Sequence, residues 1–199
     1  MYVWPCAVVL AQYLWTQRDE LRDKTVLELG AGVSLPGVVA GRCGAKVILS
    51  DNATTPQCLE NCRRSCEVNG LHDVLVLGLT WGDVSPDLVL LPKLDIILGS
   101  DVFYEPQDFE DVLVTVAFLL RENPGAQFWT TYQERRFSKK LLCVCEGNST
   151  LLRRWKLSCI DVRPENFDAD KPELAGSSTP GIHSVQMMII TLKADDVGL

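Results

Sequence analysis

The sequence predicts an α/β fold, in which a doubly wound, mostly parallel seven-stranded sheet ends in an antiparallel pair of strands. Strand-like and helix-like segments alternate over the first two thirds of the chain, which indicates a parallel sheet with helices on both faces. A glycine-rich turn follows the first expected strand, as is typical of such folds where they bind a cofactor. Near the C-terminus two strand-like runs follow each other without a helix between them, and we expect these two strands to pair antiparallel.

The length and composition of the chain indicate one globular domain that spans residues 1–199. With 47% hydrophobic and 23% charged residues, the chain has the apolar content of a folded core and not the charge of a disordered protein. No apolar run reaches the roughly 18 residues of a membrane helix, and the apolar N-terminus lacks the basic leader of a signal peptide. We therefore expect a soluble monomer that is not secreted.

The first half of the chain contributes three strands and three helices to this prediction. Apolar residues recur at helical spacing at positions 4, 7, 8, 11, 14 and 15, so we expect an amphipathic N-terminal helix. Apolar runs at 25–30, 45–51 and 73–79 are expected strands, and the segments 34–43 and 54–69 between them are expected helices. Pro36 is compatible with the first turn of one helix, and Gly70 ends the next.

The second half begins with an apolar run at 94–101 that has the composition of a strand covered on both faces. An amphipathic helix is expected over 108–123, ended by Pro124 and Gly125, and a fifth strand over 126–132. A helical stretch over 138–155 then leads to two strands at 156–162 and 183–192, separated by a loop rich in proline, glycine and serine.

The eight cysteines raise the question of a disulfide scaffold or a zinc site. Cys58, Cys62 and Cys66 repeat every four residues, along one face of an expected helix. Zinc requires a fourth ligand, but the sequence has no paired C-x-x-C motif and only two histidines, His72 and His183. We interpret the cysteines as free thiols and expect no bound metal, in a protein of the cytoplasm and nucleus.

The net charge of −7 bears on the partners of the protein. Phosphate binding is driven by basic surfaces, so this charge opposes direct binding of nucleic acid. It suits a basic protein or peptide substrate such as a histone tail, which opposite charge would attract. Solubility alone explains the same charge equally well. The basic run Arg135–Lys140 is interpreted as the exposed start of a helix and not as a phosphate site.

The glycine-rich turn indicates a cofactor that has an adenosine but no pyrophosphate. Gly30-Ala31-Gly32 follows the first strand, but Leu35 stands where a dinucleotide-binding turn has its third glycine, and the turn contains no basic residue. S-adenosylmethionine fits this pattern, because glycines allow close approach and an acid after the second strand accepts hydrogen bonds from ribose hydroxyls. Asp51 stands at that position. The alternative is a purely structural turn with a solvated Asp51.

Several motifs together resemble the seven-strand, S-adenosylmethionine-dependent protein methyltransferases of the methyltransferase-like lysine group. They are VLELGAG at 26–32, SD at 50–51, LTWG at 79–82 and DIILGSDVFYEP at 95–106, and the resemblance covers nearly the whole chain. It implies a Rossmann-like class I methyltransferase fold with S-adenosylmethionine as cofactor. The cofactor-binding roles that it implies fall on Trp4, Gly30, Ala31, Gly32, Asp51, Trp81 and Ser100. Family members often begin well upstream of the Val3-Trp4 segment, so we expect either that this form lacks substrate-binding elements or that its pocket is more open.

In the lysine group, an acid, two apolar residues and an aromatic follow the fourth strand, and here they are Asp101 to Tyr104. The resemblance implies that Asp101 holds the acceptor nitrogen by charge, while Tyr104 lines the channel and stacks on a cation. This motif favours lysine as the acceptor. Arginine stays open, because Asp101, Glu105 and Glu28 supply several acids near this rim. A scaffold that binds cofactor or partners without catalysis is the alternative from another class.

Overall fold

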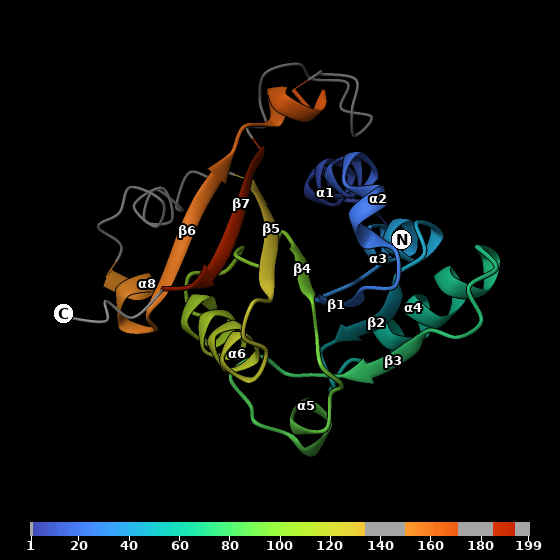
Figure 1. Cartoon of the computed structure of the whole chain (residues 1–199). Coiled ribbons are helices and arrows are strands. Elements are labelled where there is room, and N and C mark those ends of the chain that lie inside the picture. The colour runs from blue at the N-terminus through green and yellow to red at the C-terminus, as the bar shows by residue number, and fades with distance from the viewer. Residues whose placement is uncertain (1, 134–149, 171–184, 194–199) are drawn as a thin grey trace.

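The computed structural model describes residues 2–133, 150–170 and 185–193, and it has the predicted α/β architecture (Figure 1). One seven-stranded sheet has the order β3-β2-β1-β4-β5-β7-β6. Its strands are β1 (Thr25–Leu29), β2 (Lys46–Asp51), β3 (Leu75–Gly78), β4 (Ile96–Ser100), β5 (Gln127–Gln133), β6 (Leu157–Val162) and β7 (Val185–Leu192). The helices are α1 (Pro5–Thr16), α2 (Arg18–Leu21), α3 (Leu35–Arg42), α4 (Pro56–Val68), α5 (Pro86–Val89), α6 (Phe109–Glu122) and α8 (Thr150–Arg154).

The order of the parallel strands reverses beside β1. This strand pairs in parallel with β2 on one side and with β4 on the other, and β4 pairs in parallel with β5. In open parallel sheets, ligands bind beyond the carboxyl ends of the strands at such a reversal. The topology therefore predicts that a ligand binds at the loops that follow β1 and β4.

Helices cover both faces of the sheet, as the alternating pattern predicts. One core lies between the sheet and α1, α3 and α4, and the other lies between the sheet and α5, α6 and α8 (Figure 1). Successive residues of a strand point to opposite faces. In β4, for example, Ile96 and Leu98 belong to the first core while Ile97 belongs to the second. Burial on both faces explains why this strand reads as a continuous apolar run.

The C-terminal strands form the expected antiparallel arrangement, with one feature that their order in the chain does not reveal. β7 is antiparallel to β6, but it lies between β5 and β6 and also pairs antiparallel with β5. The last strand is thus an inner strand, and β6 forms the edge of the sheet. Inner position explains the apolar sequence of β7, in which Met187, Met188 and Ile190 are buried.

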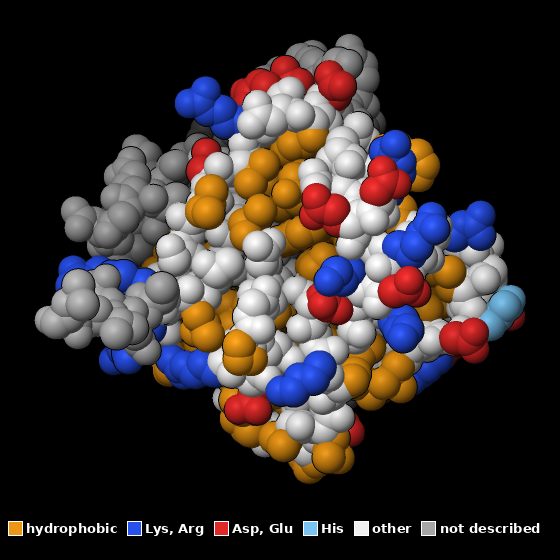
Figure 2. All heavy atoms as spheres, in the orientation of Figure 1, with side chains coloured by type: hydrophobic (Ala, Val, Ile, Leu, Met, Phe, Trp, Pro, Cys, Tyr) orange, Lys and Arg blue, Asp and Glu red, His pale blue; other side chains and the backbone are white. Residues whose placement is uncertain are grey.

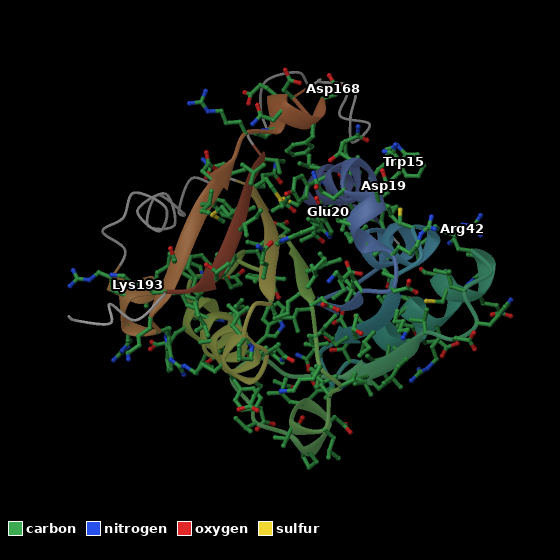
Figure 3. All side chains as sticks on the ribbon, in the orientation of Figure 1. Trp15, Asp19, Glu20, Arg42, Asp168 and Lys193 are labelled. Atoms are coloured by element: carbon green, nitrogen blue, oxygen red, sulfur yellow. The ribbon has the colours of Figure 1, made fainter. Side chains whose placement is uncertain are left out.

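Some details of the elements differ from the prediction. The short helices α2 and α5 lie in segments to which the sequence assigned no element, and the 3₁₀ helix η1 (Pro164–Phe167) lies in the loop expected before the last strand. Of the helix expected over 138–155, only α8 falls within the described residues, and Arg135–Lys140 lies outside them. The buried face of α1 differs from the expected one, because Trp15 (labelled in Figure 3) is 55% exposed. The guanidinium of Arg18 lies over the Trp15 ring, at 5.1 Å from its centroid.

The surface bears charges of both signs. On the face seen in Figure 2, basic and acidic side chains are interspersed over α1 to α4. Apolar side chains gather over α5 at the bottom of this view, where Val89 and Leu90 are exposed. The excess of acidic residues therefore does not form one uniform field on this face. None of the described helices has the length and apolar character needed to cross a membrane.

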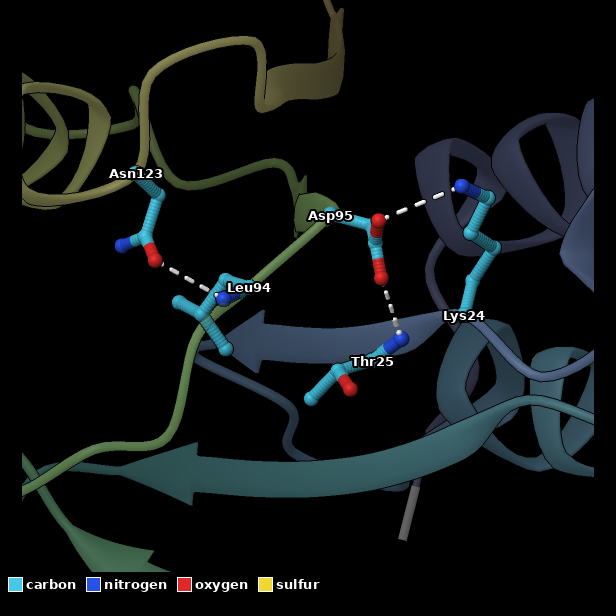
Figure 4. Close-up of polar contacts among 5 residues, drawn as sticks. All are labelled: Lys24, Thr25, Leu94, Asp95 and Asn123. Atoms are coloured by element: carbon cyan, nitrogen blue, oxygen red, sulfur yellow. Dashed lines mark hydrogen bonds and ion pairs between the residues drawn. The ribbon is translucent and has the colours of Figure 1, made fainter.

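Polar side chains fix the amino ends of the central strands (Figure 4). The carboxylate of Asp95 accepts hydrogen bonds from the backbone N–H of Thr25, at 2.9 Å, and from Lys24 Nζ, at 3.2 Å. Asn123 at the end of α6 accepts a bond from the backbone N–H of Leu94, at 2.8 Å. These contacts hold β1, β4 and α6 together at the end of the sheet opposite the rim at which the glycine-rich turn lies.

Asn123→Ala is expected to destabilise the fold by about 1–3 kcal/mol, because the buried N–H of Leu94 loses its acceptor. Urea unfolding measures this loss. Asn123 also donates a hydrogen bond to the carbonyl of Leu119, four residues earlier. Asn69→Ala is the matched control, because Asn69 donates in the same way to the carbonyl of Ser65 but lies on the surface, so we expect a change below about 0.5 kcal/mol. Equal effects of the two substitutions would show that the buried bond to Leu94 contributes nothing special.

Candidate active site

A cavity of about 800 Å³ lies beyond the carboxyl ends of β1 to β4. All nine residues that the sequence assigned to cofactor or acceptor binding line it, namely Trp4, Gly30, Ala31, Gly32, Asp51, Trp81, Ser100, Asp101 and Tyr104. The fold brings together segments that are up to a hundred positions apart, because each follows the end of a neighbouring strand or lies beside it. The volume falls within the roughly 300–1,000 Å³ of small-molecule sites. These residues therefore form one candidate site, in which their individual roles stay predictions.

The glycine-rich turn approaches Trp81 so closely that it needs glycine at its first position. Gly30 has a positive φ of 60°, and a Cβ at this position would lie 2.9 Å from Cζ2 of Trp81. The Trp81 loop is itself tied to α6, since Gly82 donates a backbone hydrogen bond of 2.9 Å to the hydroxyl of Thr115. The indole of Trp81 therefore lies against Gly30, while the next residue is tied to α6, and the ring forms a flat apolar part of the cavity wall.

Asp51 holds the same turn through its carboxylate. One oxygen accepts a hydrogen bond from the backbone N–H of Gly32, at 2.8 Å, and the other accepts from the N–H of Asn52, at 2.8 Å. A carboxylate has about four lone-pair sites, so both oxygens can accept further bonds from ribose hydroxyls. The thiol of Cys62 contacts the carbonyl of Gly32 from α4, at 3.7 Å. Asp51 therefore stabilises the glycine-rich turn, in addition to the ligand-binding role that we predict for it.

Asp51→Ala is expected to weaken cofactor binding by about 1.5–3 kcal/mol, the range for a charge-assisted hydrogen bond. The loss has two sources, the bonds to the ribose and the contact that fixes Gly32. Calorimetric titration with S-adenosylmethionine measures it. Asp73→Ala, at an exposed acid outside the cavity, is the control. Unchanged affinity in a folded Asp51→Ala protein would exclude the ribose assignment.

The close contact between helix and strand that a dinucleotide fold makes at its third glycine occurs here at Gly37. A Cβ on Gly37 would lie 2.4 Å from Cδ2 of Leu49 and 2.6 Å from Oε2 of Glu28. The packing glycine is therefore present two positions after Leu35, inside α3. The sequence analysis compared only position 35 with the third glycine of a dinucleotide fold. Gly37, directly after Pro36, was the glycine in the sequence that could have indicated this contact.

Glu28 does not lie at the rim, contrary to our expectation. It is fully buried, its Oε2 accepts a 2.9 Å hydrogen bond from the backbone N–H of Gly37, and it is not among the residues that line the cavity. Alternation along β1 directs this side chain toward α3. The pKa of Glu28 is raised to about 8. Burial is the main cause, the hydrogen bond from Gly37 lowers the pKa, and the charge of Asp51 raises it. Glu28 is thus a buried acid of the core and not a group that meets a substrate.

Asp101 leaves β4 in a left-handed backbone conformation, with φ of 56°. Its backbone N–H donates a 2.8 Å hydrogen bond to the carbonyl of Thr131 on β5. The residue is 8% exposed and lines the cavity. The Asp101 carboxylate therefore belongs to the cavity wall, and its role in holding an acceptor nitrogen stays a prediction.

Tyr104 also lines the cavity, with its ring edge-on to Trp81 at 6.4 Å between centroids. Desolvation raises the pKa of Tyr104, and the carboxylates of Asp108, Asp51, Glu105 and Asp101 raise it further, in this order. The phenol therefore keeps its proton at neutral pH. It can donate a hydrogen bond or form an aromatic wall, but it does not supply a base.

The N-terminal segment adds exposed aromatic rings to the cavity wall. Tyr2 and Trp4 are 62% and 53% exposed, lie edge-to-face at 4.9 Å between centroids, and both line the cavity. Trp4 is the residue before Pro5, which begins α1. These rings form part of the cavity wall, and the role of Trp4 in covering a ligand stays a prediction.

The charge of the cavity has one sign. Five acids line it, Asp51, Asp101, Glu105, Asp108 and Asp111, and no Lys, Arg or His is found among the described residues of its wall. Such a wall attracts cations and repels phosphates. It fits S-adenosylmethionine, which carries a sulfonium and no phosphate, and it fits a basic side chain as the second ligand.

Sequence reasoning missed part of this wall. Asp108 and Asp111 belong to the start of α6, while Asn52, Asn61 and Thr80 supply neutral polar groups and Tyr2 and Leu79 apolar surface. The acids at the start of α6 resemble an ordinary helix start in the sequence. Asn61 lies in the middle of α4, where nothing in the sequence indicates that it faces a ligand.

The cysteines within the described residues are free thiols. They are Cys6, Cys43, Cys58, Cys62, Cys66 and Cys159, whereas Cys143 and Cys145 lie outside the described residues. Burial raises the pKa of Cys62 to about 11, so its thiol stays protonated. Over the described part of the chain, no three His, Cys, Asp or Glu side chains gather in an arrangement that could hold a metal ion.

Comparison with known proteins points to methyl transfer. A family model described as lysine methyltransferase matches residues 1–143. Histone-arginine methyltransferase METTL23 from Xenopus laevis is 62% identical and covers 100% of this chain and 82% of its own. The human protein of that name is 53% identical over 99% of this chain and 100% of its own. The segments GAGVSLPG, FEDVL and NFDADK of the present sequence also resemble methyltransferase-like protein 23.

More distant relatives carry a different acceptor in their names. Protein N-lysine methyltransferase METTL21A from Xenopus tropicalis is 37% identical over 59% of this chain and 54% of its own. Among solved structures, magnesium protoporphyrin IX methyltransferase from Synechocystis, with bound SAM, has a TM-score of 0.61 at 15% identity and covers 91% of this chain and 76% of its own. The ribosomal protein L11 methylase of Lactobacillus delbrueckii also has a TM-score of 0.61 at 15% identity, with 92% and 78% coverage.

Proposed function

The chain belongs to the lysine methyltransferase family, and we propose that it transfers the methyl group of S-adenosylmethionine to an arginine side chain of a basic protein such as a histone. Cofactor-dependent methylation of proteins is the activity of this family and its named relatives. The single observation that carries the choice of acceptor is the charge of the cavity, which combines five carboxylates with no described basic residue.

The carboxylates favour arginine over lysine for a reason of protonation. A lysine must lose its proton before its nitrogen can accept a methyl group, and its unperturbed pKa is about 10.4. Nearby carboxylates stabilise the charged ammonium and raise that pKa, which opposes the reaction. A guanidinium stays charged, with a pKa above about 12, and carboxylates can hold it through paired hydrogen bonds. An acidic wall thus suits the acceptor that remains a cation.

The residues of the chain divide the work between two ligands. The turn at Gly30 to Gly32, Asp51 and Trp81 would hold the cofactor, which supplies the methyl group from a positively charged sulfur. Asp101 would hold the guanidinium, orient one nitrogen toward the methyl group and take up the proton that this nitrogen releases. Tyr104 and Trp4 would exclude water and fix the plane of the acceptor. Most of the rate enhancement then comes from alignment and electrostatics.

Relatives support the same choice. The histone-arginine methyltransferases match this chain over nearly its whole length, whereas the lysine methyltransferase METTL21A of Xenopus tropicalis matches over 59% of it. Lysine is the second candidate, since the family model is described by that acceptor and the Asp101 to Tyr104 motif favoured it in the sequence. We also propose that the protein occurs in both the cytoplasm and the nucleus, since a histone in chromatin can be methylated only in the nucleus. Imaging of the tagged protein in cells would test this localisation.

The experiment is transfer of a tritiated methyl group to purified core histones, followed by mass spectrometry of the product. We expect methylarginine, and we expect the rate to fall as salt screens the attraction between the acidic cavity and its basic substrate. Methyllysine as the only product would reverse the choice of acceptor. Binding of the cofactor without labelling of any basic protein would favour the scaffold alternative.

A further inference from the structure

Thr131 connects the two walls of the cavity although it does not line the cavity itself. It lies on β5 and is fully buried. In the sheet it stands opposite Ser100 of β4 on one side and Met187 of β7 on the other. Strands on both sides fix the backbone of Thr131, and its partner Ser100 lines the cavity.

The backbone of Thr131 supports the acceptor side of the cavity. Its carbonyl accepts the 2.8 Å hydrogen bond from the N–H of Asp101. Asp101 is in the left-handed region at φ 56°, where residues other than glycine are uncommon although aspartate is tolerated better than most. Such a conformation persists only where surrounding contacts enforce it. The bond to Thr131 is one of these contacts, and it sets the direction in which the chain carries the Asp101 side chain.

The hydroxyl of Thr131 supports the part of the cavity wall that the N-terminal segment forms. Its Oγ1 donates a 2.8 Å hydrogen bond to the carbonyl of Cys6, in the first turn of α1. Trp4 stands two residues earlier as the N-cap of this helix, and it makes no side-chain capping bond. Tyr2 and Trp4 are largely exposed, so their position depends on how firmly the first turn of α1 is held. The hydroxyl of Thr131 anchors that turn to the sheet.

We propose that Thr131 is a positioning residue for methyl transfer, which fixes the distance between the Trp4 wall and the Asp101 carboxylate through its hydroxyl and its carbonyl. The inference rests on the roles proposed above for Trp4 and Asp101. It adds a residue that touches neither ligand and acts through the start of α1. Because transfer depends on alignment, a displacement of about 1 Å at either wall can lower the rate up to a hundredfold.

The neighbouring Thr130 provides a matched control. It is also fully buried, and its hydroxyl also donates to a backbone carbonyl, that of Gly99, at 2.7 Å. Successive residues of β5 point to opposite faces of the sheet, and here Trp129 joins the core beside α1 while Phe128 joins the core beside α6. Thr130 therefore points away from α1. Replacing either threonine with valine removes one buried hydroxyl, but only Thr131→Val releases the first turn of α1.

The experiment compares Thr131→Val, Thr131→Ser and Thr130→Val for stability, cofactor affinity and steady-state methyl transfer. We expect both valine variants to lose similar stability. Thr131→Val alone should lower kcat by about tenfold or more and weaken cofactor binding several-fold. Thr131→Ser keeps the hydroxyl and should stay within about threefold of the wild type. Equal kinetic losses in Thr131→Val and Thr130→Val, or no rescue by serine, would overturn the proposal.

The result separates this proposal from the proposed function. If the wild type methylates no basic protein, the choice of substrate fails, and calorimetric affinity for S-adenosylmethionine then decides on Thr131. Weaker binding in Thr131→Val than in Thr130→Val supports the anchoring of the Trp4 wall. Identical affinities of these two variants reject it. If the wild type is active, the kinetic comparison decides directly.

Discussion

Asp101→Asn should nearly abolish methyl transfer while leaving the affinity for S-adenosylmethionine close to that of the wild type. The substitution removes the charge and keeps the shape of the side chain. We expect a rate loss of a hundredfold or more, on the order of 3–4 kcal/mol, because charge and alignment are lost together. Asparagine tolerates the left-handed conformation that residue 101 adopts, so the fold and the bond to Thr131 should survive.

Single-turnover transfer of tritiated methyl groups to histones measures this effect, with calorimetry as the test of cofactor binding. Asp87→Asn is the control, since Asp87 is an exposed acid in α5 that does not line the cavity. If Asp101→Asn retained full activity, Asp101 would have no part in the mechanism. Glu105, Asp108 and Asp111 would then be the remaining candidates to hold the acceptor, because Glu28 is buried away from it.

Glu28 should make the free energy of unfolding decrease as the pH rises from about 4.5 to about 8. Glu28→Gln should abolish this contribution to the pH dependence. The buried Glu28 has a pKa raised to about 8 from 4.5, so the folded protein retains a proton there that the unfolded chain releases. A raised pKa of this kind contributes stability that is complete below the unfolded value and is lost as the pH passes the folded value. The full contribution amounts to roughly 5 kcal/mol at most.

Urea unfolding of wild type and Glu28→Gln at pH 5, 6.5 and 8 tests this prediction through the difference between the two proteins. The groups that interact with the charge of Glu28 are Asp51 of β2 and Cys62 and Cys66 of α4. Glu60→Gln serves as the control, since Glu60 forms an exposed pair with Arg63 and should show no such pH dependence. Parallel stability curves for wild type and Glu28→Gln would mean that Glu28 is ionised in the folded protein.

The sequence by itself predicted the architecture and most of the residues that line the candidate site. Alternating patterns located the seven strands, because a buried parallel strand must be apolar and its crossover helix must be amphipathic. The Gly30-Ala31-Gly32 turn and Asp51 were located because each follows a strand, and the carboxyl ends of parallel strands meet at one rim. The family resemblance added Trp81 and Asp101, which follow the next two strands. Motif and periodicity are local properties, so a single sequence reveals them.

Only the tertiary structure decided the directions of side chains and the contacts between distant elements. Glu28 and Asp101 both stand in or just after strands, yet one is directed under α3 and the other at the cavity. The inner position of β7 and the acids at the start of α6 were equally hidden, as was the bond between Thr131 and Cys6, which lie 125 positions apart. Such features depend on which face of an element packs against which neighbour, and packing of this kind joins residues whose separation along the chain carries no periodic signal.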